Sequence, residues 1–372
     1  MNIGYFIRRN WYPPRAGSAV HIFQVASQLT ARGHHLSSIF TDHCDPQVVR
    51  YQPTQLPAFL RQVDLIYIRI FAGWTTGKFS LLKLLKGGAC PVVWELNAPL
   101  EEQLLVGKSR RQVAWMHYQR RLVAGLVDAC ICNSQWNADY AARHWGIKRN
   151  VVVRLGSDPK LFDPDKRDPR LYDSLGAGFK VVWAGTARFQ WHCLPLIVQV
   201  AERMRGIDPA VSFILIGGKG HLRQHQSWPE NVTLLDEVPY LDLPPYLASA
   251  DLGLCFYQRP GHGMVFYRSP LKVFDYMASG LPVIATEEEE MRPVVRRGHN
   301  GLLVDNDVEQ IVEAILQIKE NKGWRQRMGL AGREDVVRYY NWQRVAEETE
   351  AVFHSVLGQP PRATAHASPG ER

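Results

Sequence analysis

The stretch from residue 269 to residue 285 constrains the fold of this chain most, because it holds a helix start, a helix end and a buried strand in succession. Ser269 is a favourable N-cap residue, and Pro270 suits the first turn of a helix that begins there. Gly280 ends that helix, and the apolar residues from Val283 onward begin a strand. A helix followed at once by a buried strand is typical of parallel α/β sheets.

The start of this helix also predicts a ligand site. The free backbone N–H groups of a first helical turn and the positive end of the helix dipole bind anions such as phosphate. Asp275 lies further along the same helix, and its carboxylate can accept hydrogen bonds from the two hydroxyl groups of a ribose. Together, the helix start and Asp275 predict a site that holds a sugar nucleotide.

The seventeen residues of this stretch resemble the donor-site motif of the retaining GT-B glycosyltransferases of family 4, in its SPLK-type variant. The resemblance extends from Asn2 to about Leu357. It implies an enzyme that transfers a sugar from a nucleotide-diphosphate-sugar to a saccharide or lipid-linked acceptor, in cell-surface polysaccharide or glycolipid synthesis. Asp275 stands where relatives carry a glutamate that binds the donor ribose. The donor contacts implied by the motif are Ser269, Pro270, Leu271 and Asp275.

Short apolar strands alternate with helical stretches in both halves of the chain, which predicts parallel sheets with helices on both faces. The expected fold class is α/β with two Rossmann-like domains, and the resemblance implies that their parallel sheets face a central cleft, as in the GT-B fold. The strands expected in the first half are Ile3–Ile7, Leu36–Phe40, Leu65–Ile68, Val92–Glu95, Ala129–Cys132 and Val151–Val153. Those expected in the second half are Lys180–Trp183, Val211–Ile216, Val232–Leu235, Leu252–Phe256, Val283–Ala285 and Leu302–Val304.

Between Asp158 and Gly178 the sequence is rich in charged residues and prolines, and we expect the prolines to interrupt any helix there. We therefore expect an acceptor-side domain at residues 1–165, a linker at 166–177 and a nucleotide-sugar-binding domain at 178–340. The resemblance places a helix at 341–357 that crosses back to the first domain. Residues 358–372, rich in Pro, Gly, Ala and Ser, are expected to form a disordered tail.

A net charge of +8 and a sequence pI near 9.2 indicate an anionic partner. The basic residues form no long run with interleaved aromatic residues, which argues against nucleic acid. An anionic membrane surface or a phosphate-bearing acceptor is favoured, with a solvated helix face as the alternative for the residues after position 100. The residues expected to contact that partner are Arg8, Arg9, Trp11, Tyr12, Lys108, Arg110, Arg111, Arg120 and Arg121.

The strand expected at the N-terminus leaves no room for a signal peptide, and no apolar run is long enough to span a membrane. We therefore expect a cytoplasmic protein that can bind peripherally to the cytoplasmic face of the membrane. The spacing of the six cysteines matches no zinc pattern, so we expect neither disulfides nor metal ligands, and no cofactor beside the donor substrate. The cysteines are Cys44, Cys90, Cys130, Cys132, Cys193 and Cys255.

Two further segments of the second half resemble parts of the family's donor site. Arg188 and His192 stand where relatives carry an arginine and a lysine that neutralise the donor diphosphate. Lys272, inside the motif helix, is expected to compensate for the weaker charge of the histidine. Gly218, in the glycine cluster after residue 216, is expected near the nucleotide base, with a purely structural turn as the alternative.

In the first half, Gly17 follows the first strand and leads into a helix, where relatives place a glycine-rich loop against the donor diphosphate. Glu95 and Asn97 end a strand and are expected at the cleft. The expected catalytic residues are Arg188, Lys272 and Asn97, although an asparagine cannot act as a base.

The resemblance implies transfer on one face of the sugar, with the leaving diphosphate accepting the proton of the acceptor. Catalysis then depends on positioning and on electrostatic stabilisation of the leaving group. Tyr267, His192 and Ser18 depart from the family pattern. These departures favour one alternative, a degenerate transferase that binds a nucleotide sugar as a scaffold. A nucleotide-sugar epimerase of the same fold is the second alternative.

Overall fold

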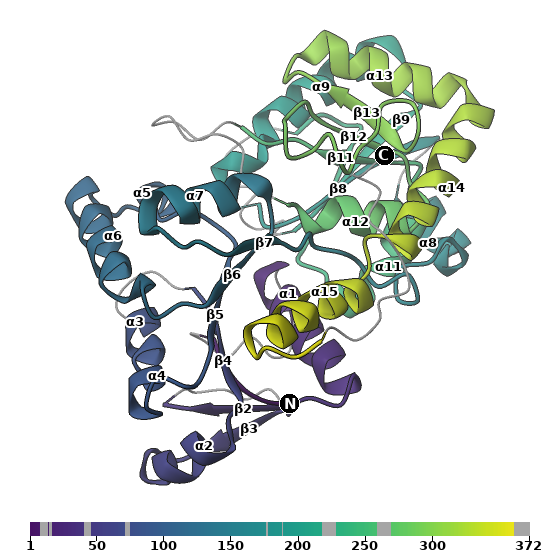
Figure 1. The fold of residues 1–372 in the computed structure, drawn as a ribbon. Helices are drawn as coiled ribbons and strands as arrows, with labels where there is room; N and C mark the ends of the chain where they lie inside the picture. Colours follow the sequence, from purple (N-terminus) through teal and green to yellow (C-terminus); the bar gives the residue numbers. More distant parts are fainter. Residues whose placement is uncertain are drawn as a thin grey trace.

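The computed structural model describes residues 1–7, 14, 17–40, 46–70, 75–175, 178–187, 189–217, 228–258 and 269–360. Within these residues the chain forms two separate β-sheets, and helices pack against both (Figure 1). Every neighbouring pair of strands is parallel. The prediction of an α/β protein with two Rossmann-like domains is therefore confirmed.

The first sheet has seven strands in the order β3-β2-β1-β4-β5-β6-β7. The strands are β1 (Asn2–Phe6), β2 (His35–Ile39), β3 (Val48–Tyr51), β4 (Leu65–Arg69), β5 (Val92–Leu96), β6 (Ala129–Cys132) and β7 (Asn150–Val152). The helices of this half are α1 (Gly17–Ala31), α2 (Leu56–Gln62), α3 (Thr75–Ser80), α4 (Leu82–Leu85), α5 (Glu102–Leu105), α6 (Arg110–Ala124) and α7 (Gln135–Trp145), with the short helix η1 (Pro53–Gln55). In Figure 1, α1 lies on one side of this sheet and α3, α6 and α7 lie on the other.

The second sheet has six strands in the order β10-β9-β8-β11-β12-β13. The strands are β8 (Phe179–Ala184), β9 (Val211–Ile216), β10 (Val232–Leu235), β11 (Leu252–Cys255), β12 (Val283–Thr286) and β13 (Gly301–Val304). The helices of this half are α8 (Pro169–Ser174), α9 (Leu194–Ile207), α11 (Pro244–Ala248), α12 (Leu271–Ala278), α13 (Val308–Glu320), α14 (Lys322–Arg338) and α15 (Trp342–Val356), with the short helices η2 (Pro164–Lys166), η3 (Gln190–His192) and η4 (Tyr240–Asp242).

Every strand expected from the sequence is present, with ends shifted by at most one residue. Strand β3 was not expected. It lies at the edge of its sheet, and only Val48 among its residues is buried, so its sequence lacks the apolar run of a central strand.

The expectation that proline interrupts any helix in the linker is wrong at Pro169. A short helix, α8, begins at this residue, and the Asp168 side chain accepts hydrogen bonds from the backbone N–H groups of Arg170 and Leu171. Proline fits the first position of a helix because its missing N–H would have no intrahelical partner there. An aspartate followed by proline therefore starts a helix here.

The final helix, α15, packs against α1 of the first domain (Figure 1). Arg32, just after α1, donates a hydrogen bond from Nε to Glu350 on α15 at 2.8 Å, and the ring of His34 contacts the same carboxylate at 3.0 Å. The ring of His21 on α1 stacks on Trp342 at the start of α15, with 5.6 Å between centroids. These contacts fix the end of the second half of the chain to the first domain.

Each helix in the described part of the chain is too short or too polar to cross a lipid bilayer. Cys90, Cys130, Cys132, Cys193 and Cys255 are buried free thiols. Cys44 lies outside the described residues.

Candidate functional site

A cavity of about 520 Å³ lies between the two domains and is lined by residues of both. The first domain contributes the start of α1 and the ends of β4 and β5, and the second contributes the end of β8, η3 and the start of α12. Ligands of open α/β sheets bind at the carboxyl ends of the strands, and this cavity lies at those ends. The predicted site residues that line it are Gly17, Asn97, His192, Ser269, Pro270, Leu271, Lys272 and Asp275. Arg188 and Gly218 lie outside the described residues.

The helix that was predicted to start directly after Ser269 begins one residue later than expected. Helix α12 begins at Leu271, and Pro270, with extended backbone, occupies the N-cap position without a side-chain cap. Ser269 therefore does not cap the helix; its Oγ is buried and accepts no hydrogen bond from a described residue. The prediction that Ser269 caps the helix is wrong, because Pro270 has extended backbone and itself takes the N-cap position, which leaves Ser269 one residue too early.

Two helix N-termini meet at the cavity. Gly17 is the first residue of α1, and a Cβ atom built on it would lie 3.3 Å from Cδ1 of Leu271, the first residue of α12. The first N–H groups of a helix have no partner within the helix, and they carry the positive end of its dipole. The two ends together make this part of the cavity suited to an anion.

Lys272 places a cation at the same position. Its Nζ is shielded from solvent and finds no hydrogen-bond acceptor among the described residues. It lies over the rings of Trp183, 4.3 Å from the centroid, and Tyr257, 5.9 Å away. Burial lowers the pKa of Lys272 to about 8. At neutral pH the cavity therefore holds an ammonium group that aromatic rings stabilise and that no carboxylate of a described residue neutralises.

A glycine makes room for this ammonium group. A Cβ atom at Gly185, which follows β8, would lie 2.7 Å from Nζ of Lys272, closer than real Cβ contacts. Gly185 thus allows the lysine head to reach the end of the strand. His192 lies beside the same aromatic residues, with its ring edge-on to Trp183 at 5.6 Å and tilted against Tyr257 at 5.2 Å.

Asp275 lies one turn further along α12 and is almost fully buried, with 4% of its surface exposed. Its Oδ1 accepts hydrogen bonds from Ser157 Oγ at 2.5 Å and from Tyr240 Oη at 3.2 Å. Burial raises the pKa of this carboxyl group to about 7, although the two hydroxyl donors oppose the shift. Asp275 is therefore poised between its neutral and charged forms near neutral pH.

The first domain presents a different kind of site, a network around Glu95. This carboxylate, 3% exposed, accepts hydrogen bonds from Tyr67 Oη at 2.6 Å and from Arg69 at 3.0 Å. Asn97 Nδ2 donates to the same group at 2.5 Å. Burial alone would raise the pKa of Glu95, but the neighbouring positive charge and hydrogen bonds lower it. The buried carboxylate is thus charged and well compensated.

His21 completes this network. Its Nδ1 accepts a hydrogen bond from Arg69 at 2.9 Å, because a guanidinium offers only donors, so its proton lies on Nε2, which faces Glu95 at 3.5 Å. Burial lowers the pKa of His21 to about 4. The imidazole is neutral at neutral pH, and Arg69 carries the positive charge beside Glu95.

The motifs placed Glu95 and Asn97 at the cleft; Asn97 lines the cavity, whereas Glu95 is buried and is not one of the lining residues. Arg69 and His21 line the cavity although no motif indicated them. Arg69 ends an apolar strand, so the sequence could place it at the edge of the sheet, but its position beside Glu95 comes from the pairing of β4 with β5 in the structure. His21 had no such signal, because its position depends on how α1 packs against the sheet and α15.

One basic residue predicted at the surface is buried instead. Arg120 on α6 is 2% exposed and lies over the rings of Trp94 and Trp145, at 5.6 Å and 5.9 Å. Its prediction as a lipid contact is wrong, because position 120 falls on the face of α6 that packs against the sheet. Arg110, Arg111 and Arg121 on the same helix are exposed.

Two family models match the chain. The model described as Glycosyltransferase Family 4 matches residues 15–161, and the model described as Glycosyl transferases group 1 matches residues 178–321. The first match falls on the seven-stranded sheet and the second on the six-stranded sheet.

Curated relatives match over shorter stretches. The chain is 27% identical over 128 residues to spore coat protein SA of Bacillus subtilis, which is 33% of this chain and 32% of that protein. It is 25% identical over 158 residues, 41% of each chain, to the GDP-mannose-dependent alpha-(1-6)-phosphatidylinositol monomannoside mannosyltransferase of Mycobacterium tuberculosis. The matched stretch thus spans about a third to two fifths of the length of these relatives.

Solved structures share the fold over nearly the whole chain. Sucrose-phosphate synthase from Thermosynechococcus elongatus matches with a TM-score of 0.72 at 18% identity, covering 96% of this chain and 99% of that one. Anabaena HepE in complex with UDP-glucose matches with a TM-score of 0.68 at 15% identity, covering 95% and 100%. The chain therefore carries the two domains of a GT-B glycosyltransferase, a Glycosyltransferase Family 4 domain followed by a Glycosyl transferases group 1 domain.

Proposed function

We propose that this protein is a retaining glycosyltransferase that transfers a sugar from a nucleotide-diphosphate-sugar to a saccharide or lipid-linked acceptor. The observation that carries the proposal is the ammonium group of Lys272, which has no acceptor among the described residues and lies where the N-termini of α1 and α12 meet. A buried cation without a counter-ion is costly, so such a group is retained where a ligand supplies the negative charge. A diphosphate fits that requirement.

The donor is proposed to lie along the start of α12. Lys272 and the first N–H groups of α1 and α12 hold the diphosphate, and His192 contacts it from η3. Asp275 accepts hydrogen bonds from the ribose hydroxyls, which stabilise its charged form. Arg188 and Gly218 are proposed to contact the diphosphate and the base, as their motifs imply.

The transfer step is proposed to proceed on one face of the sugar. The bond between the anomeric carbon and the diphosphate oxygen breaks, the acceptor oxygen bonds to the same carbon, and the leaving diphosphate takes the acceptor proton. Glu95 is unsuited as a nucleophile, because it is 3% exposed and Tyr67 and Arg69 hold both of its oxygens. The Oδ1 atom of Asn97 has no partner among the described residues and lies at the cavity. It is proposed to accept a hydrogen bond from a hydroxyl group of the sugar or of the acceptor.

The acceptor is proposed to reach the cleft from the first domain, at the cytoplasmic face of a membrane. Helix α6 supports this arrangement, because Trp115, Tyr118 and Leu122 are exposed on it together with Arg111 and Arg121. Exposed aromatic and basic residues on one helix are typical of contact with anionic lipid. Vesicle sedimentation with and without anionic lipid tests this part, and equal binding to both would contradict it.

The donor site is tested by calorimetry with UDP-, GDP-, ADP- and dTDP-sugars on the wild type, Asp275→Ala and Lys272→Met. Selective binding of one nucleotide that both variants weaken supports the site. With that donor, a panel of acceptors then gives a glycoside whose anomeric configuration, read by NMR, decides between retention and inversion. Conversion of the donor without acceptor would identify an epimerase, and binding without any conversion would identify a scaffold.

A further inference from the structure

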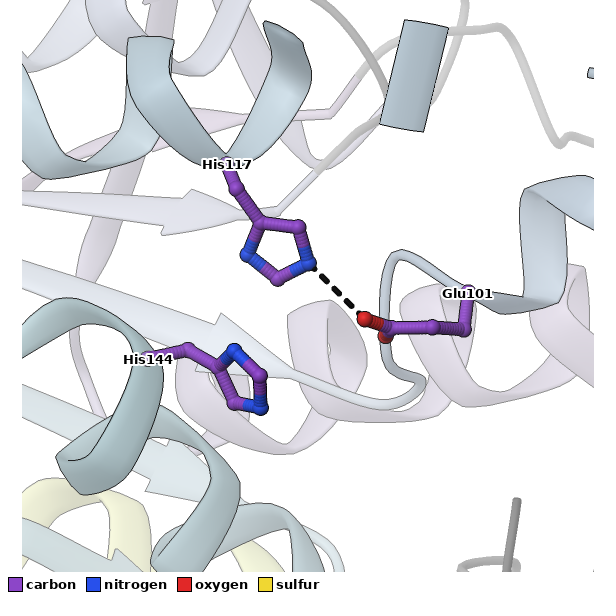
Figure 2. Close-up of side chains that lie close together, drawn as sticks. All are labelled: Glu101, His117 and His144. Carbon is purple, nitrogen blue, oxygen red and sulfur yellow. Dashed lines mark hydrogen bonds and ion pairs between the residues drawn. The ribbon is translucent and has the colours of Figure 1, made fainter. Parts of the chain in front are cut away.

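Three potential metal ligands converge outside the cleft network, at Glu101, His117 and His144 (Figure 2). Glu101 immediately precedes α5, His117 lies on α6 and His144 lies in the last turn of α7. One ligand atom from each lies within 4.8 Å of the other two. Figure 2 shows the two imidazole rings and the carboxylate gathered around a common point, with His117 Nε2 hydrogen-bonded to Glu101 Oε1 at 2.9 Å.

A second layer of hydrogen bonds holds the carboxylate in place. Tyr140 Oη donates to Glu101 Oε2 at 2.6 Å, and the backbone N–H of Leu100 donates to the same hydroxyl at 2.9 Å. Tyr140 is buried, so it cannot move away easily. It occupies Oε2 and leaves Oε1 facing the imidazoles. Metal-binding carboxylates are oriented by such outer partners.

The donor set matches a particular class of metal. Two imidazole nitrogens and one carboxylate oxygen are the protein ligands of open zinc sites, which keep a fourth position for water. In the structure the carboxylate of Glu101 accepts hydrogen bonds from His117 at Oε1 and from Tyr140 at Oε2, and the third ligand, His144, is exposed.

We propose that Glu101, His117 and His144 bind a Zn²⁺ ion, with a solvent molecule as fourth ligand on the exposed side of His144. The C-terminal dipole of α7 favours a cation at His144, whereas the nearby charges of Arg121 and Arg143 weaken its binding. In a tetrahedral site the ligand atoms lie about 3.3 Å apart. The ligand atoms now lie within 4.8 Å of one another, so metal binding would draw them closer by up to about 1.5 Å.

The ion would connect three helices next to the cleft. Glu101 leads directly into α5, and Glu102, Gln103 and Val106 of that segment line the cavity. Zn²⁺ would tie this wall of the cavity to α6 and α7. Glu101 and His117 are 16 residues apart and His117 and His144 are 27 residues apart, each on a different element, so no short sequence pattern predicts the site.

The test uses the full chain, purified without a histidine tag and treated with chelator, titrated with ZnCl₂ by calorimetry. The wild type is expected to bind one equivalent, and His144→Ala to lose that binding. His35→Ala, which removes an exposed histidine elsewhere, is the matched control and should bind as the wild type does. Tyr140→Phe keeps all three ligands and should weaken binding about ten- to a hundredfold.

Two further measurements keep the proposal open to refutation. Co²⁺ in place of Zn²⁺ should give the visible bands of tetrahedral coordination in the wild type and lose them in His144→Ala. Zn²⁺ should also slow hydrogen exchange in residues 102–105. Absence of saturable binding in the wild type, or unchanged affinity in His144→Ala, would overturn the site. Zn²⁺ binding without slower hydrogen exchange in α5 would overturn the proposed role of the ion in linking α5 to α6 and α7.

Discussion

The two walls of the cleft handle buried charge in opposite ways. In the first domain, Glu95 is matched by Arg69 and by neutral donors, so the charges of this network are balanced without a ligand. In the second domain, Lys272 has no counter-ion among the described residues, and burial brings the pKa of Asp275 to about 7. A ligand is therefore needed at the second wall, where charges of the described residues remain to be compensated.

The charges of the first wall therefore contribute to folding stability, and those of the second wall contribute to ligand binding. Removing part of a complete network leaves its partners unpaired and destabilises the fold. Removing an uncompensated group relieves a cost in the empty protein and weakens the ligand complex. We therefore expect substitutions on the two walls to affect different measurements.

The largest effect is expected for Glu95→Ala, which leaves Arg69 partly buried without its carboxylate. Loss of one partner of a buried pair typically costs about 3–5 kcal/mol of folding free energy. Chemical denaturation of the variant measures this loss. Glu309→Ala is the control, because its ion pair with Arg203 is exposed and contributes little to folding stability. A loss at Glu95 as small as that at Glu309 would show that the first wall is not a compensated network.

Lys272→Met is expected to give the opposite pattern. The transfer rate should fall about a hundred- to thousandfold, as when one oriented charge-stabilising group is lost. The empty protein should be as stable as the wild type or more stable, because a buried uncompensated charge is replaced by an apolar group of similar length. Steady-state kinetics and thermal unfolding check the two parts. Lys148→Met, at an exposed position, should change neither, and a large loss of stability in Lys272→Met would contradict the comparison.

The sequence predicted the fold well because burial leaves a direct signal in it. Every central strand is a short apolar run, whereas in edge strand β3 the two valines are followed at once by Arg50, so this signal is missing. The helix at Pro169 was not predicted, because proline ends a helix when it lies in the interior but fits the first helical position, which it occupies here. Arg120 was placed at the surface because residue type does not reveal which face of a helix packs inward.

The site was only partly predictable, for a related reason. A motif places Lys272 and Asp275 on one helix, but whether a charged group has a partner depends on residues distant in sequence. Ser157 and Tyr240 reach Asp275 from 118 and 35 residues away. The contact of Arg69 with Glu95 follows from strand register, which the sequence did not provide.

A smaller effect is expected for Asp275→Asn on stability. The pKa of Asp275 is about 7 in the folded state, against an ordinary value of 3.8 for an aspartate, so between these pH values the folded protein holds a proton that the unfolded chain has lost. Stability from this group is therefore lost as pH rises from about 4 to about 7. Asparagine removes this dependence, and it should stabilise the empty protein at pH 8, where the carboxyl group is charged in both the folded and the unfolded state. Unfolding followed at several pH values tests this, and an unchanged slope would contradict it.

The smallest effect concerns protons taken up when a nucleotide diphosphate binds at pH 8.5. Burial lowers the pKa of Lys272 to about 8, so about three quarters of it is neutral at this pH. A bound diphosphate raises that pKa, and calorimetry in buffers of different ionisation enthalpy should record an uptake of somewhat less than one proton. Asp275 is already charged at pH 8.5, and His21, with a pKa of about 4, stays neutral, so neither contributes. Proton uptake that persisted in Lys272→Met would show that another group of the cleft, and not Lys272, takes up the proton.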